Sequence, residues 1–332
     1  MPSFATATVT EILEERPGLA RVATDGGRAY ALVDLTGPVA VGDRVVLNTT
    51  AVGLGLGTGG WHVVHWNLAR DEWSQPGPGH IMKLRYTSLQ VDAGATEEDH
   101  PDLPEQLDGL PVVACSLHSQ MGIVAAVART LRPDARIAYV MTDGAALPIA
   151  LSNLVHDLRR AGVLDATVTA GHAFGGDLEA VSMPSALALA RHVAEADLVI
   201  VGMGPGVVGT GSSLGTTAVE AAWAVDSVAA LGGRAALCVR ASEADPRGRH
   251  RGISHHSATV LRLARTRPAL PLPPDLAGEV DGAVAVEPPD VVKVLENLDL
   301  RVITSMGRGP AEDPMFFATA GAAGAWLASI DK

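Results

Sequence analysis

The pattern of apolar and polar positions divides the chain into two parts. Up to about residue 70, short segments of alternating apolar and polar residues are separated by turn residues. Asp25-Gly26-Gly27 lies between two such segments, which is typical of a β-hairpin. Further strand patterns follow at Arg44 to Asn48 and at residues 61–68. We therefore expect a small N-terminal β-barrel-like module.

From residue 111 onward, continuous apolar runs alternate with segments of helical periodicity. Continuous runs are typical of parallel strands that helices cover on both faces. Right-handed crossovers then predict an α/β, Rossmann-like domain with a doubly wound, mostly parallel sheet and helices on both faces. The predicted strands are 111–116, 135–142, 165–171, 197–203, 234–241 and 300–306, and the predicted helices are 119–131, 146–161, 183–195, 216–231, 254–265 and 314–329.

Three segments follow from this pattern: a β module at 1–70, a connecting segment at 71–110 and the α/β domain at 111–332. The connecting segment carries seven acidic residues between positions 92 and 108, with no Lys or Arg among them. We interpret this stretch as a solvated acidic linker.

The composition of the chain argues against two classes of binding partner, nucleic acids and anionic membranes. The 37 acidic and 25 basic residues among 332 give a net charge of 25 − 37 = −12. Nucleic acids and anionic membranes require a basic surface, so we expect neither as a partner. The chain shows no signal peptide, no apolar run of membrane-spanning length and no CxxC pair, which together predict a cytoplasmic protein.

Polar residues follow every predicted strand of the α/β domain. Ligands of parallel sheets bind outside the carboxyl ends of the strands, although the same residue types also form ordinary turns and helix caps. We therefore expect a small anionic ligand, carrying phosphate or carboxylate, at this edge. The ligand-binding candidates are Ser116, Ser119, Gly204, Gly206, Gly209, Thr210, Gly211, Ser212, Arg240 and Arg308, and the catalytic candidates are His118, Asp143, His172 and Asp177.

The glycine run at residues 202–217 contains GxGxxG from Gly204 to Gly209. The acidic residue that a dinucleotide site places at the end of the next strand is absent, because that strand ends at Arg240. An anion cradle built from backbone N–H groups fits better, and a loop that serves only close packing is the alternative. The GxSxG at 211–215 lies too far past its strand for a nucleophile elbow. The sequence leaves the cofactor open.

Two further kinds of site, a metal centre and a cysteine nucleophile, have less support in the sequence. His118, Asp143, His172 and Asp177 follow neighbouring strands and could converge on a metal, but no HxH or HExxH spacing supports this and we assign no metal ligand. Cys115 with His118 could form a nucleophile pair, although a free Cys in an apolar strand is commonly a small buried hydrophobe.

The segment 246–267 carries six Arg and three His and no acidic residue. It is open to three interpretations: a solvated loop and helix face, an anion-facing loop with Arg247, Arg249 and Arg251 as phosphate clamps, or a partner of the acidic stretch.

Several segments together resemble a family of uncharacterised bacterial proteins that is described as a domain of unknown function. They are GLGTGGWH (55–62), GHIMKLRYTSLQ (79–90), CSLHSQ (115–120), TDGAALP (142–148) and GHAFGGDLEA (171–180). The resemblance covers nearly the whole chain. It implies a cytosolic bacterial protein without an assigned reaction, and it transfers no catalytic residue.

Three functions remain as hypotheses, and whether the protein is an enzyme stays open. The first is a protein that binds a small anionic molecule. The second is a non-catalytic assembly or regulatory module that forms a homo-oligomer through its β-barrel and its small-residue C-terminal helix, with Gly321 and Gly324 at the contact. The third is a metal-dependent hydrolase.

Overall fold

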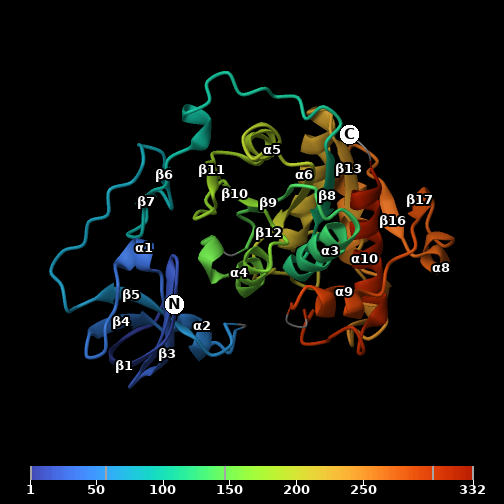
Figure 1. The fold of residues 1–332 in the computed structure, drawn as a ribbon. Coiled ribbons are helices and arrows are strands. Elements are labelled where there is room, and N and C mark those ends of the chain that lie inside the picture. Colours follow the sequence, from blue (N-terminus) through green and yellow to red (C-terminus); the bar gives the residue numbers. More distant parts are fainter. Residues whose placement is uncertain (1, 57, 146, 301–302, 331–332) are drawn as a thin grey trace. The chain divides into compact units, whose positions relative to one another are not determined.

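The computed structural model describes residues 2–56, 58–145, 147–300 and 303–330. The chain separates into two compact units, with the division after Gly94. We describe each unit by itself (Figure 1).

The first unit is built on a closed five-stranded barrel, which confirms the predicted β module. The strands are β1 (Phe4–Arg16), β2 (Leu19–Thr24), β3 (Gly27–Ala31), β4 (Arg44–Asn48) and β5 (His62–Asn67), in the order β1-β2-β3-β5-β4. β1 pairs with β4 through residues 4–8 and with β2 through residues 9–16, and two irregularities interrupt the pairing with β2, between Val9 and Glu11 and between Ile12 and Glu14. Bulges bend a strand and increase its twist, which lets one long strand serve both neighbours.

The barrel interior is filled by small and β-branched side chains, among them Val22, Ala29 and Val45, none of which is exposed. Such residues suit the narrow interior of a small barrel. Two short helices, α1 (Val33–Thr36) and α2 (Thr50–Gly53), and a two-stranded sheet of β6 (Met82–Lys83) and β7 (Val91–Asp92) complete the unit.

The second unit contains a six-stranded sheet in which every pair is parallel, so the chain is α/β as predicted. Its order is β11-β10-β9-β12-β8-β13. The strands are β8 (Pro111–Cys115), β9 (Ile137–Thr142), β10 (Ala166–Ala170), β11 (Leu178–Ala180), β12 (Leu198–Met203) and β13 (Arg234–Cys238). Five of them confirm predicted strands.

The sixth predicted strand, at 300–306, is wrong for the residues that are described. Residues 301 and 302 lie outside them, and Ser305 forms only an isolated bridge with Arg308. The sixth place belongs to β11, a three-residue strand with a glutamate at its centre. A segment so short carries no apolar run, and only its pairing with β10 makes it a strand.

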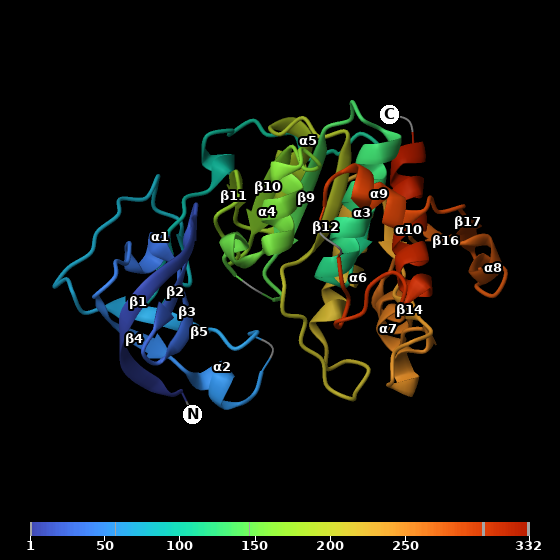
Figure 2. The same cartoon turned by 60° about the horizontal axis from the view of Figure 1, so that its bottom comes forward.

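Helices pack against both faces of this sheet (Figure 2). Val113 and Ile200 join a core with α3, α4, α9 and α10, whereas their strand neighbours Val112 and Val199 join a core with α5 and α6. The helices are α3 (His118–Leu131), α4 (Asn153–Arg160), α5 (Met183–His192), α6 (Glu220–Ala230), α7 (His255–Leu263), α8 (Pro274–Ala277), α9 (Val291–Asn297) and α10 (Pro314–Ser329). The prediction of α10 is confirmed at both ends, and α8 and α9 were not predicted.

The small residues of α10 pack against other helices of the same chain. A Cβ on Gly324 would lie 2.8 Å from the carbonyl oxygen of Val124 in α3, and one on Gly321 would lie 3.0 Å from Val291 of α9. The glycines therefore allow close helix packing within this unit, and their surface is not free for a second copy of the chain.

Part of the acidic stretch is structural. Glu97, in the short 3₁₀ helix η1 (Thr96–Glu98), accepts hydrogen bonds from the Val181 N–H at 2.9 Å and from the Ser185 hydroxyl at 2.7 Å. It thereby holds the segment that leads from β11 into α5.

Two short strand pairs and two 3₁₀ helices lie after β12. They are η3 (Thr217–Val219), β14 (Ala241–Ser242) with β15 (Gly252–Ile253), η4 (Gly248–His250), and β16 (Leu270–Leu272) with β17 (Ala283–Ala285). None of the helices formed by the described residues has the length and apolarity needed to cross a membrane.

Candidate functional site

His118 lies at the carboxyl end of β8, where it ties three elements together. Its Nε2 is 2.7 Å from the Ser152 hydroxyl before α4, and its Nδ1 is 3.2 Å from the carbonyl oxygen of Met203 in β12. Burial lowers the pKa of His118 from 6.5 to about 4, so the ring is neutral at physiological pH. Nearby, the buried Ser116 hydroxyl donates to Gln120. These contacts give both residues a structural role.

Of the other catalytic candidates, Asp143 and His172 lie next to each other, whereas Asp177 occupies a separate place. Exposed Asp143 accepts a hydrogen bond from the His172 backbone N–H at 2.9 Å. Asp177 accepts from both the N–H and the hydroxyl of Thr167 and pairs with Arg159, which fixes the turn between β10 and β11. Together with His118, these residues form no metal-ligating group within the part of the chain that the structure describes.

The exposed tip of the glycine run is closed by its own hydrogen bonds. The Thr210 N–H donates to the Gly215 carbonyl, and the Thr210 and Ser212 hydroxyls lie 3.0 Å apart. The N–H groups of Ser212 and Gly215 in turn donate to these hydroxyls. The N–H groups of Thr210, Ser212 and Gly215 are therefore already bonded within the loop and are not available to an anion.

Gly209, at the base of the glycine run, lies next to the ring of His256. A Cβ at this position would lie 3.5 and 3.6 Å from Cε1 and Nε2 of the His256 ring. The backbone therefore passes close to this ring, and any longer side chain at position 209 would cover it.

The structure brings Arg240 and Arg308 together, although 68 positions separate them in the sequence (308 − 240). Arg240 is 4% exposed, and its Nη2 donates to Asp245 Oδ2 at 3.2 Å. Arg308 donates to the same oxygen at 3.4 Å, and Arg247 donates to both oxygens of this carboxylate. Asp245 is fully buried, so the buried guanidinium of Arg240 and the partly exposed guanidinium groups of Arg247 and Arg308 converge on one carboxylate.

A second buried carboxylate completes this group. Asp313 accepts from Arg308 Nε at 3.1 Å and from the Ser242 hydroxyl at 2.6 Å. Its other oxygen, Oδ1, is buried without a hydrogen-bond partner. We call Arg240, Arg247 and Arg308 with Asp245 and Asp313 the arginine cluster. Three positive and two negative charges leave it with an excess of one positive charge.

The pKa values reflect these charges. Hydrogen bonds from Arg247 hold the pKa of Asp245 well below its usual range, so this carboxylate is ionised. Burial, together with the charges of Arg247 and Arg308, lowers the pKa of Arg240 to about 10. Arg240 stays protonated at neutral pH, but its charge is poorly solvated and would gain from a nearby anion.

Three histidines lie beside the arginine cluster, at the start of α7. Each of His250, His255 and His256 offers a ring nitrogen, and these nitrogens lie within 4.8 Å of one another. Ser254 caps α7: its hydroxyl accepts from the His256 N–H and lies 2.8 Å from Nδ1 of His250. We call these three residues the histidine cluster.

The rings of the histidine cluster are neutral at physiological pH. Burial, followed by the charges of nearby arginines, lowers the pKa of His250 to about 3. Burial and the neighbouring His255 lower that of His256 to about 4. The Nε2 atoms of His255 and His256 are buried without a hydrogen-bond partner.

Sequence reasoning found Arg240 and Arg308 but missed their carboxylates and the histidine cluster. The three histidines lie within the basic segment 246–267, and a spacing of His-x4-His-His was their only signal. Sequence reasoning also missed Glu220, a half-buried residue whose carboxyl group accepts a hydrogen bond from the Thr142 hydroxyl at 2.8 Å. Burial raises the pKa of Glu220.

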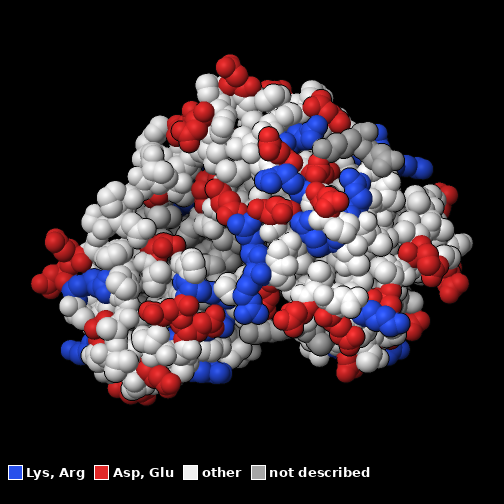
Figure 3. Space-filling view, viewed as in Figure 1, with Lys and Arg blue, Asp and Glu red and all other residues white. Residues whose placement is uncertain are grey.

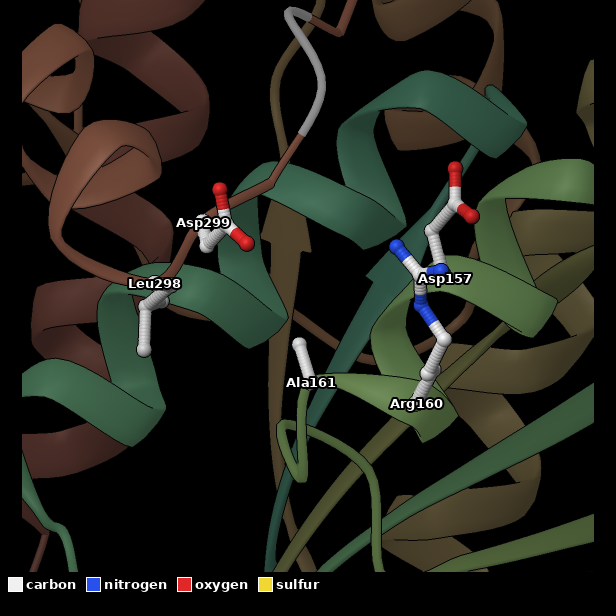
Figure 4. A pocket seen from close by; sticks show the side chains of 5 residues that line it. All are labelled: Asp157, Arg160, Ala161, Leu298 and Asp299. Carbon is white, nitrogen blue, oxygen red and sulfur yellow. The ribbon is translucent and has the colours of Figure 1, made fainter.

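A pocket of about 300 Å³ lies elsewhere, between the end of α4 and the segment after α9 (Figure 4). It is lined by Asp157, Arg160, Ala161, Leu298 and Asp299. In a crossover unit, the helix ends where the next strand begins, so this pocket lies at the amino edge of the sheet. It is separate from the carboxyl edge, where parallel sheets bind ligands.

The fold and its buried polar groups define a class: an α/β protein with an all-parallel sheet, a closed N-terminal barrel and a charged cluster after β13. The chain belongs to the family described as "Protein of unknown function (DUF3866)", which matches residues 28–324. This confirms the expected membership of a family without an assigned reaction. No curated protein and no solved structure matches the chain.

Proposed function

We propose that this protein binds a small anionic ligand at the carboxyl edge of its parallel sheet, beside β12 and β13. One observation carries the proposal: the arginine cluster gathers three guanidinium groups, of which that of Arg240 is buried and those of Arg247 and Arg308 are partly exposed, around only two buried carboxylates. An unbalanced charge in a region of low dielectric is unfavourable, and an anion would neutralise it. The excess charge therefore favours a negatively charged ligand.

The position of the cluster supports the same proposal. β8 leads to β9 on one side, whereas β12 leads to β13 on the other, so the strand order reverses between β8 and β12. Such a reversal, with helices on both faces, is typical of a doubly wound, Rossmann-like sheet, and ligands bind at this point. The glycine run leaves β12 here and reaches the histidine cluster at Gly209.

The ligand is small rather than polymeric. The net charge is −12, and acidic and basic side chains are interspersed over the face shown in Figure 3. A long polyanion needs an extended basic surface, whereas one buried positive charge suits a single anionic group. Ligand binding by itself does not decide whether a reaction follows.

Isothermal titration calorimetry with inorganic phosphate, sulfate, acetate and a nucleoside monophosphate tests the proposal. Arg308→Met removes the excess charge, so we expect it to weaken binding of the best anion at least tenfold. Arg262→Met, on the exposed part of α7, is the matched control and should leave binding unchanged. Absence of binding by all four anions would refute the proposal.

A metal-dependent hydrolase is the second candidate function, and the histidine cluster is the observation that favours it. It would not use the four residues first considered, since His118, Asp143, His172 and Asp177 do not gather. A homo-oligomeric assembly in the cytoplasm remains a further proposal, but it requires a surface other than Gly321 and Gly324, which pack within the chain.

A further inference from the structure

The histidine cluster contains two of the buried polar atoms that have no hydrogen-bond partner among the described residues. They are Nε2 of His255 and Nε2 of His256, and His256 is only 4% exposed. A buried polar nitrogen without a partner costs about 1–3 kcal/mol. Two such atoms on adjacent residues, whose rings are 4.4 Å apart between centroids, point to a ligand that satisfies both.

The protonation of His256 indicates what this ligand is. Arg240 Nη1 lies 3.5 Å from Nδ1 of His256, and a guanidinium only donates. The lone pair of the neutral ring therefore faces Arg240 at Nδ1, and the proton is on Nε2. In this tautomer Nε2 is a hydrogen-bond donor and has no lone pair for a metal ion.

The charges around His255 and His256 also favour an anionic ligand over a metal ion. His255 and His256 are the first two residues of α7, and a helix N-terminus carries a partial positive charge. The arginine cluster adds its excess positive charge, and exposed Arg249 lies close enough to lower the pKa of His255 and His256. A divalent cation would be repelled here, whereas an oxyanion would be attracted.

The number and direction of the donors distinguish between anions. The Nε2–H of His256 and the unpartnered Nε2 of His255 both belong to the start of α7, whereas Arg240 and Arg247 belong to the segment before it. A planar carboxylate has two oxygens and matches one donor pair, whereas a phosphate has at least three acceptor oxygens and up to two negative charges. A phosphate dianion also neutralises the excess positive charge of the arginine cluster and the partial positive charge at the N-terminus of α7.

We propose that His255 and His256 bind a phosphate-type tetrahedral oxyanion through their Nε2–H groups, between Gly209 of the glycine run and the arginine cluster. This inference rests on the proposed function and narrows its ligand to phosphate and phosphate monoesters. A Cβ at position 209 would lie 3.6 Å from Nε2 of His256, so a side chain longer than that of glycine would compete with the anion for this nitrogen.

The experiment is titration of the full chain with inorganic phosphate, with acetate and, separately, with Co²⁺. The variants are His255→Gln and His256→Gln, and the control is His100→Gln, an exposed histidine outside the cluster. We expect phosphate to bind at least tenfold more tightly than acetate, and each cluster variant to weaken phosphate binding at least tenfold. Circular dichroism verifies that each variant is folded.

A second pair of variants leaves the histidines intact. Gly209→Leu places a side chain against Nε2 of His256 and should abolish phosphate binding without loss of folded structure. Gly211→Leu is its matched control in the same loop, because a Cβ there meets no atom within 4 Å.

The outcomes separate the inference from the proposed function. If phosphate binds equally to the wild type and to both histidine variants, the inference is wrong but the anion site stands. Equal affinity for acetate and phosphate would overturn the ligand class. One Co²⁺ per chain, lost in the histidine variants, would assign the cluster to a metal. If no anion binds, both proposals fail.

Discussion

At the scale of single residues, Asp245 is a buried carboxylate that holds three arginines together. It is fully buried and accepts hydrogen bonds from Arg240, Arg247 and Arg308. Its carboxylate therefore connects the segment after β13 with the segment before α10. Without it, three guanidinium groups would repel one another in a poorly solvated region.

We accordingly expect Asp245→Ala to lower the free energy of unfolding by about 3–5 kcal/mol, the usual effect of removing one partner of a buried ion pair. Urea unfolding followed by circular dichroism measures this. Glu243→Gln, an exposed acid two positions earlier, should change stability by no more than about 0.5 kcal/mol. A stability for Asp245→Ala equal to that of the wild type would contradict the buried cluster.

A second residue-scale prediction concerns pH. The pKa values of His118, His250 and His256 lie below 6.5 in the folded chain, at about 4, 3 and 4. Between these values and 6.5 the unfolded chain binds more protons, so acid favours unfolding. Stability should therefore be complete above about pH 6.5 and fall continuously toward about pH 4.

Urea unfolding at a series of pH values across this window provides the measurement. His256→Gln removes one titrating group, so its stability should fall less steeply with acid than that of the wild type. A stability that stays constant between about pH 6.5 and pH 4 would show that these rings are not buried in the neutral form.

At the scale of elements, α10 and α3 form a close helix pair. The sequence predicted the bounds of α10 because its apolar run ends at clear signals, Pro314 at the start and a polar Ser329 at the end. The run of small residues did not reveal what α10 packs against. The carbonyl oxygen of Val124 lies 2.8 Å from where a Cβ of residue 324 would be, so only glycine fits there.

Gly324→Val should therefore separate the two helices and lower the free energy of unfolding by about 1–3 kcal/mol, as overpacking does. Ala318→Val, at a half-buried position of the same helix, introduces the same side chain and lowers the helix propensity, which Gly324→Val does not, yet it should have the smaller effect. Thermal unfolding of both variants compares them. If Gly324→Val instead changed only the oligomeric state, as size-exclusion chromatography would show, the intramolecular packing would be refuted.

At the scale of the whole molecule, each unit has its own apolar core: one inside the barrel and two on the faces of the parallel sheet. The arginine and histidine clusters and the glycine run all belong to the unit that follows Gly94. The barrel contributes none of these residues.

We therefore expect a chain of residues 95–332 to fold and to bind inorganic phosphate within about threefold of the affinity of the full chain, a difference of under about 1 kcal/mol. Calorimetric titration of the shortened chain measures this. A folded but non-binding product would show that the barrel contributes to the anion site.

The sequence by itself determined the strands and helices whose apolar pattern is strong. Five strands of the parallel sheet, the barrel strands from β2 to β5 and α10 could be predicted, because burial on one or two faces dictates a local periodicity. The sequence also singled out Arg240, which follows β13, and Arg308, although the strand expected before Arg308 is not formed by the described residues. Tertiary structure alone decided that these two arginines share Asp245, that β11 completes the sheet and that three histidines meet at the start of α7. Each of these depends on contacts between segments that are far apart in sequence, and such contacts leave no periodic signal in the chain.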